Sequence, residues 1–159
     1  MNIYLNIYDV TPANNFLDKI GIGAYHTGIQ FGDNEFSFSK NKGIYYIDIR
    51  NTNHFRKSIY LGNLDISKEN ILQTLNLYKN DFNEKTYHLV LNNCNHFTDI
   101  ICKNFFDKNL PNYLNRLPYL CSCLHKILPY NLLFKCHSNN NNNNNNNSHE
   151  IKLFNNNLH

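Results

Sequence analysis

The chain has 159 residues, 42% of them hydrophobic, which is enough to bury the core of a single domain. Its formal net charge is only +3, and its 15 lysines and arginines are scattered along the sequence, so nucleic-acid binding is not expected. Five cysteines form no CxxC pair, and their odd number argues against a disulfide framework, so we interpret them as reduced thiols.

The first half of the chain has the pattern of a β-sheet. Residues 3–8 alternate aliphatic with polar or aromatic side chains, as a half-buried strand does. Residues 25–31 and 35–38 predict a hairpin, because Gly32, Asp33 and Asn34 between them tolerate a positive φ. Residues 43–49 and 58–62 are also strand-like, whereas 9–12 interrupt the first strand and are followed by a loop.

The second half changes to a helical period. Ser67 is a good N-cap, and Ile66 with Ile71 forms a hydrophobic staple at the start of a helix that should run to about Lys79. A second helix should begin after Asn93, because apolar residues follow at helical spacing: Phe97, Ile100, Ile101 and Phe105. It should stop within 107–111, and residues 110–128 predict a short helical segment that ends at Pro129.

The end of the sequence has a different composition. Residues 139–147 are nine consecutive asparagines, which have no apolar side chains to offset the entropy of ordering them. We therefore expect one domain over residues 1–136 and a disordered tail over 137–159 without a catalytic role.

The motif YHLVLNNCNHF, residues 87–97, places Cys94 in the first turn of the second predicted helix. Free N–H groups and the positive end of the helix dipole meet there, and both favour a thiolate over a thiol. Acyl transfer by a thiolate also requires a proton-transfer partner, so a histidine is needed nearby. A free cysteine taken alone is as often a small buried hydrophobe.

Of the eight histidines, His26 is the best candidate for that partner. It lies at the start of a hairpin strand, and its small neighbours Thr27 and Gly28 should leave the ring accessible. The other histidines lie in the tail or the last helical segment, on the wrong side of the Cys94 helix, or at positions without a distinguishing feature: His125, His137, His149, His159, His96, His54 and His88.

Three segments together resemble the PPPDE family, the desumoylating isopeptidases, and most of all its second main branch. They are GIGAYHTGIQFGDNEFSFS (21–39), YHLVLNNCNHFT (87–98) and LPNYLNRLPYLCSCL (110–124). The resemblance covers roughly residues 2–129. It implies an α+β, circularly permuted papain-like fold in which an antiparallel sheet or barrel packs against helices. It also implies a catalytic dyad of His26 and Cys94, with Cys94 inside the family motif N-C-N-x-F.

The resemblance implies a cysteine isopeptidase that removes ubiquitin or a ubiquitin-like modifier (SUMO) from target lysines. The alternatives are a protein S-acyl thioesterase, that is, a depalmitoylase, with the same dyad, and a catalytically silent ubiquitin-binding module. No cofactor, metal, nucleic acid or membrane span is expected, and both a monomer and a homodimer remain open. The sequence starts without a secretory signal pattern, so the cytoplasm, and also the nucleus, is the expected location.

A third catalytic side chain is left unassigned, with four polar strand residues in reach: Asn6, Tyr8, Gln30 and Glu35. Ser39 stands where the family usually has glycine, so substrate selection transfers less well than chemistry. A zinc site is a further alternative, because cysteines and histidines gather near the end of the domain, although their spacing is unlike that of paired zinc knuckles: Cys121, Cys123, His125, Cys136 and His137.

Overall fold

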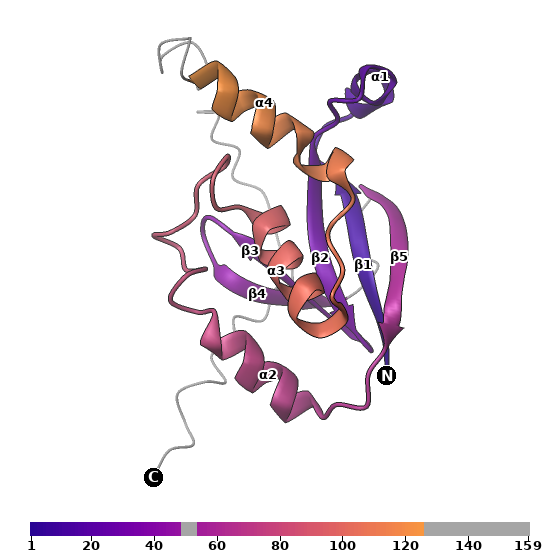
Figure 1. Ribbon diagram of the computed structural model, residues 1–159, viewed down its shortest axis with the longest axis vertical. Helices are drawn as coiled ribbons and strands as arrows, with labels where there is room; N and C mark the ends of the chain where they lie inside the picture. Colours follow the sequence, from indigo (N-terminus) through magenta and orange to yellow (C-terminus); the bar gives the residue numbers. More distant parts are fainter. Residues whose placement is uncertain (49–53, 126–159) are drawn as a thin grey trace.

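The computed structural model describes residues 1–48 and 54–125 (Figure 1). Five strands form one sheet in the order β4-β3-β2-β1-β5, and all four pairings are antiparallel. This confirms the predicted α+β class with an antiparallel sheet. The strands are β1 (Asn2–Asp9), β2 (Tyr25–Phe31), β3 (Asn34–Ser39), β4 (Gly43–Asp48) and β5 (Phe55–Asn63). The helices are α1 (Asn14–Leu17), η1 (Asp18–Ile20), α2 (Lys68–Leu77), α3 (Cys94–Phe106), η2 (Asn112–Asn115) and α4 (Arg116–His125).

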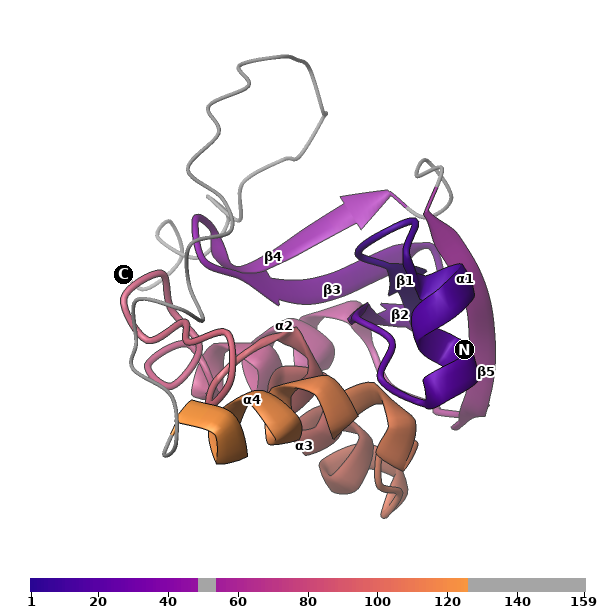
Figure 2. The same cartoon turned by 90° about the horizontal axis from the view of Figure 1, so that it is seen from above.

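One face of the sheet carries the core. Alternate residues of β1 and β2 turn to this face and are buried, because their side chains repeat every second position: Ile3, Leu5 and Ile7, with Ile29 and Phe31. Phe97 and Ile101 of α3 are fully buried in the same cluster. Figure 2 shows α2, α3 and α4 on this side of the sheet, so the helices form a second layer.

The two long helices begin where their caps predict. Ser67 accepts a hydrogen bond from the N–H of Asn70, and α2 follows. The Asn93 side chain accepts hydrogen bonds from the N–H groups of Asn95 and His96. The His96 ring in turn accepts a hydrogen bond from the Asn93 N–H, which completes a capping box. The first residue of α3 is therefore Cys94.

The opposite face of the sheet is polar, although several of its side chains are also buried. Asn6, Glu35 and Ser37 are all inaccessible to solvent. β2 and β3 pair only from Ile29 to Phe31, so the start of β2 has separated from β3 at residue 27. This separation opens the sheet beside His26.

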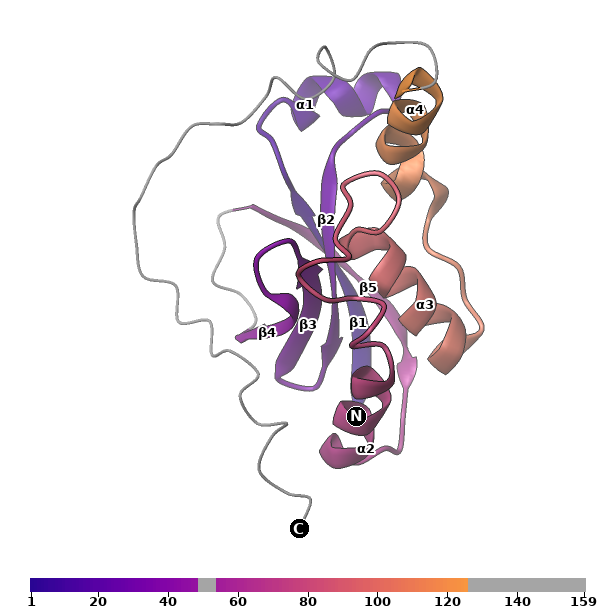
Figure 3. The same ribbon diagram turned by 90° about the vertical axis from the view of Figure 1, so that its left-hand side faces the viewer.

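Two elements differ from the prediction. The loop expected after residue 12 contains α1 and η1, which are too short to show a helical period in the sequence. In Figure 3 they lie at the same end of the molecule as α4. Within residues 1–48 and 54–125, no helix is long and apolar enough to cross a membrane. Residue 49 of the fourth predicted strand, the end of the last helical segment and the predicted tail lie outside the described residues.

Candidate active site

The N-terminus of α3 is fixed to β2 by buried hydrogen bonds. The hydroxyl of Thr27 donates to Asn95 Oδ1 at 2.8 Å and lies 2.8 Å from the hydroxyl of Thr98. Asn95 Nδ2 donates to the carbonyl of Leu114 at 2.8 Å, which also holds η2 against the same turn. Thr27 directly follows His26, and Asn95 directly follows Cys94. These bonds therefore hold β2, which carries His26, against α3, which begins at Cys94.

Cys94 is 6% exposed, and its sulfur atom faces three hydrogen-bonding groups. Burial alone raises the pKa of the thiol. The charge of His26, the hydrogen bond to its ring, and the backbone N–H groups of Thr27 and Asn95 outweigh burial, so the pKa of Cys94 is lowered. The surroundings of Cys94 therefore favour the thiolate over the thiol.

The ring of His26 lies against that sulfur. Burial lowers the pKa of His26, but the negative charge of Cys94, the hydrogen bond to it and the charge of Glu35 have the larger combined effect, so the pKa is raised. Opposite shifts in the two partners favour a thiolate–imidazolium pair. The ring also packs on Tyr8, with the two ring centroids 6.2 Å apart.

The reason given from the sequence for an accessible His26 is wrong. The Thr27 side chain turns to the helix side of the sheet and is fully buried. No side chain larger than that of glycine fits at residue 28, because a Cβ there would lie 2.0 Å from Glu35 Oε1. His26 as a whole residue is only partly exposed.

Two side chains that the sequence analysis did not name contact His26 Nε2. Ser37 Oγ lies 3.0 Å from this nitrogen, and the hydroxyl of Tyr45 lies 3.4 Å from it. Ser37 is on β3 and Tyr45 on β4, and the two are paired across these strands. Alternation along β3 could have pointed to Ser37, because it lies two residues after Glu35 and therefore on the same face.

The four polar residues named from the sequence lie close to one another but do not hydrogen-bond the His26 ring. Glu35 Oε2 accepts from Asn6 Nδ2 at 2.7 Å and from the hydroxyl of Tyr8 at 2.5 Å, and Gln30 accepts a second bond from Asn6. Glu35 Oε1 is buried and has no hydrogen-bond partner among the described residues. Burial raises the pKa of Glu35 despite these bonds.

Other histidines and cysteines have local structural roles where they are described. His96 belongs to the capping box, and His88 Nδ1 accepts from the N–H groups of Val90 and Leu91 in the loop before α3. Cys102 lies on α3, and burial raises the pKa of its thiol to about 12. The residues of the alternative zinc site have side chains outside the described part of the chain.

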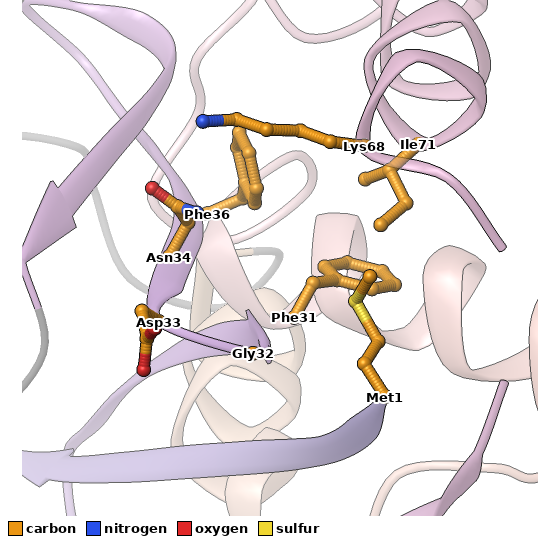
Figure 4. A pocket seen from close by; sticks show the side chains of 8 residues that line it. All are labelled: Met1, Phe31, Gly32, Asp33, Asn34, Phe36, Lys68 and Ile71. Atoms are coloured by element: carbon orange, nitrogen blue, oxygen red, sulfur yellow. The ribbon is translucent and has the colours of Figure 1, made fainter. Parts of the chain in front are cut away.

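A pocket of about 220 Å³ lies at the opposite end of β2 from His26 (Figure 4). Met1, Phe31, Phe36 and Ile71 give it an apolar lining, and Lys68 extends across its edge. None of its lining residues is a cysteine or a histidine. The candidate residues Cys94 and His26 therefore do not line this pocket.

The fold places a histidine on a strand beside a cysteine at the start of a helix. This arrangement defines the class of circularly permuted papain-like proteins. The chain belongs to the family of the "PPPDE putative peptidase domain", which matches residues 1–131. It is 34% identical to a DeSI-like protein of Arabidopsis thaliana over 82% of the chain. It is 29% identical to a desumoylating isopeptidase 1 homolog of Caenorhabditis elegans over 77% of the chain, and 29% identical to a DeSI-like protein of Schizosaccharomyces pombe over 74%. The matched regions make up 61%, 42% and 64% of these relatives, so the chain spans less than two thirds of each.

Proposed function

We propose that this protein is a cysteine isopeptidase that removes ubiquitin or a ubiquitin-like modifier, such as SUMO, from lysine side chains. The observation that carries the proposal is the pair formed by Cys94 and His26, whose pKa values are shifted in opposite directions within a chain of the PPPDE family. The names of the matched relatives, which include a desumoylating isopeptidase homolog, support a ubiquitin-like substrate.

The proposed reaction has two halves. The Cys94 thiolate attacks the carbonyl carbon at the C-terminus of the modifier, and the helix geometry leaves the Cys94 N–H without an intrahelical acceptor, so it is free to stabilise the oxyanion. The His26 imidazolium gives its proton to the lysine nitrogen as the C–N bond breaks, leaving a thioester on Cys94.

In the second half, neutral His26 takes a proton from water, and the hydroxide formed attacks the thioester carbon. The C–S bond breaks, the modifier leaves as a carboxylic acid that loses its proton to the solvent, and the thiolate–imidazolium pair is restored. Because this step is thioester hydrolysis, the same dyad has the chemistry for an S-acyl substrate, and the test below separates the two.

The test compares hydrolysis of three substrates by purified protein: a ubiquitin conjugate, a SUMO conjugate and a small S-acyl thioester. We expect release of one modifier, and loss of that activity in both Cys94→Ala and His26→Ala with unchanged far-UV circular dichroism. Turnover of the thioester alone would favour the S-acyl thioesterase. Binding of a modifier without cleavage would favour the silent module, and full activity in either variant would refute the dyad.

A further inference from the structure

Ser37 contacts the ring of His26 at its Nε2 atom. Ser37 is fully buried on β3, and its hydroxyl oxygen lies 3.0 Å from His26 Nε2 and 2.7 Å from the carbonyl oxygen of Thr27. A serine hydroxyl has a single proton, and a carbonyl oxygen can only accept. The Ser37 proton is therefore directed to Thr27, and the lone pairs of Oγ face the His26 ring.

This arrangement fixes which ring nitrogen carries a proton. If Nε2 had a lone pair instead of a proton, two acceptors would face each other at 3.0 Å. Nε2 must therefore donate to Ser37, which leaves Nδ1 as the nitrogen that faces Cys94. Tyr45 is a second, longer neighbour of Nε2 at 3.4 Å and is compatible with the same proton position.

The split between β2 and β3 makes this contact possible. The N–H and C=O of one residue in a strand point to the same side, and the β2–β3 ladder has ended at Ile29. Both groups of Thr27 are thus available beside the site: its N–H binds Cys94 Sγ and its C=O binds Ser37 Oγ. One residue of β2 therefore joins the nucleophile and the group that orients the base.

We propose that Ser37 is a positioning residue, which holds His26 with Nε2–H toward β3 and Nδ1 toward Cys94. The proposal rests on the proposed function for its kinetic consequence, but the orientation itself does not depend on any substrate. Ser37 acts through His26 and has no place in the bond-breaking steps. The titratable groups facing the pair from the surrounding elements are Tyr8 on β1, Glu35 on β3, Tyr45 on β4 and Tyr87 in the loop before α3.

The kinetic test compares Ser37→Ala with Ser37→Thr, which keeps the hydroxyl, and with Ser39→Ala as a matched control. Ser39 is two residues along the same strand and, unlike the buried Ser37, is partly exposed. The readout is the rate of Cys94 alkylation by iodoacetamide against pH. An imidazolium that loses a hydrogen-bond acceptor is less stable, so the pKa of the histidine should fall in Ser37→Ala by about 1 unit. We expect kcat/KM to fall about tenfold through kcat, with partial recovery in Ser37→Thr.

A second measurement remains decisive if Ser37→Thr does not fold. In Cys94→Ser, which has no thiolate to attract the proton, ¹⁵N chemical shifts of neutral His26 should report the Nε2–H tautomer, and Ser37→Ala added to it should reduce that population. The Nδ1–H tautomer in Cys94→Ser, or an alkylation profile that is the same in Ser37→Ala and wild type, would overturn the proposal. Cleavage of no modifier together with a shifted alkylation profile would instead refute the substrate class and leave the role of Ser37 intact.

Discussion

Replacing Asn95 by alanine tests whether the bonds between β2 and α3 hold the two reacting groups together. The change removes the acceptor of the Thr27 hydroxyl and the donor to the Leu114 carbonyl. Thr27 can redirect its proton to Thr98, 2.8 Å away, so the loss there should be about 1 kcal/mol. The carbonyl of Leu114, a fully buried residue, loses the amide group that donates to it, which costs about 1–3 kcal/mol.

We therefore expect Asn95→Ala to lower the free energy of unfolding by about 2–4 kcal/mol, which a domain of ordinary stability survives. The assay is urea unfolding followed by far-UV circular dichroism, with the midpoint and slope fitted separately. Asn95→Asp should be at least as unstable, because a carboxylate cannot donate to Leu114. Asn76→Ala, at an exposed position of α2, is the control and should change stability by less than about 0.5 kcal/mol. An Asn95→Ala protein as stable as that control would show that the Asn95 hydrogen bonds do not stabilise the fold.

Three further predictions concern other contacts of the site and the core. Gly28→Ala should destabilise the fold, because its Cβ would lie 2.0 Å from Glu35 Oε1. The loss of stability should be much smaller when Glu35→Ala is already present. Equal losses in both backgrounds, measured by thermal unfolding, would show that the two residues are not coupled. Because the pKa of Cys94 is lowered and that of Cys102 is raised to about 12, iodoacetamide at pH 7 should modify Cys94 and spare Cys102, and peptide mass spectrometry showing the reverse order would contradict the site electrostatics. Phe97→Ala should cost about 3–5 kcal/mol, since the ring is fully buried against Phe38 and Phe82; a loss below about 1 kcal/mol in urea unfolding would mean that the core is packed differently.

The elements beside the site could be predicted because their signals are local. The cap at Asn93 and the apolar spacing after it identify the start of α3, and therefore the position of Cys94 in its first turn. The turn residues 32–34 identify the β2–β3 hairpin and place His26 near its open end. These features depend on a few neighbouring residues, so a single sequence contains them.

The surroundings of His26 could not be predicted because they depend on contacts across strands. Ser37 reaches the His26 ring because β3 separates from β2 after the pair Ile29–Phe36. Tyr45 reaches the same ring because β4 pairs with β3. The sequence predicts that Gly28 leaves the His26 ring accessible, whereas Gly28 makes room for Glu35, which is seven residues away in the sequence. The polar residues on one strand face do not reveal which of them touches the base until the register and the separation of the strands are known.

Covalent capture by modifier probes tests the proposed chemistry most directly. Ubiquitin and SUMO, each with an electrophile in place of the C-terminal carboxylate, would be incubated with the wild-type protein, with Cys94→Ala, and with Cys102→Ala as a control for the buried second thiol of α3. A cysteine isopeptidase with Cys94 as nucleophile should form a stable adduct on Cys94 with one modifier, unchanged in Cys102→Ala and absent in Cys94→Ala. Folded wild-type protein that forms no adduct with either probe, or an adduct that persists in Cys94→Ala, would contradict it.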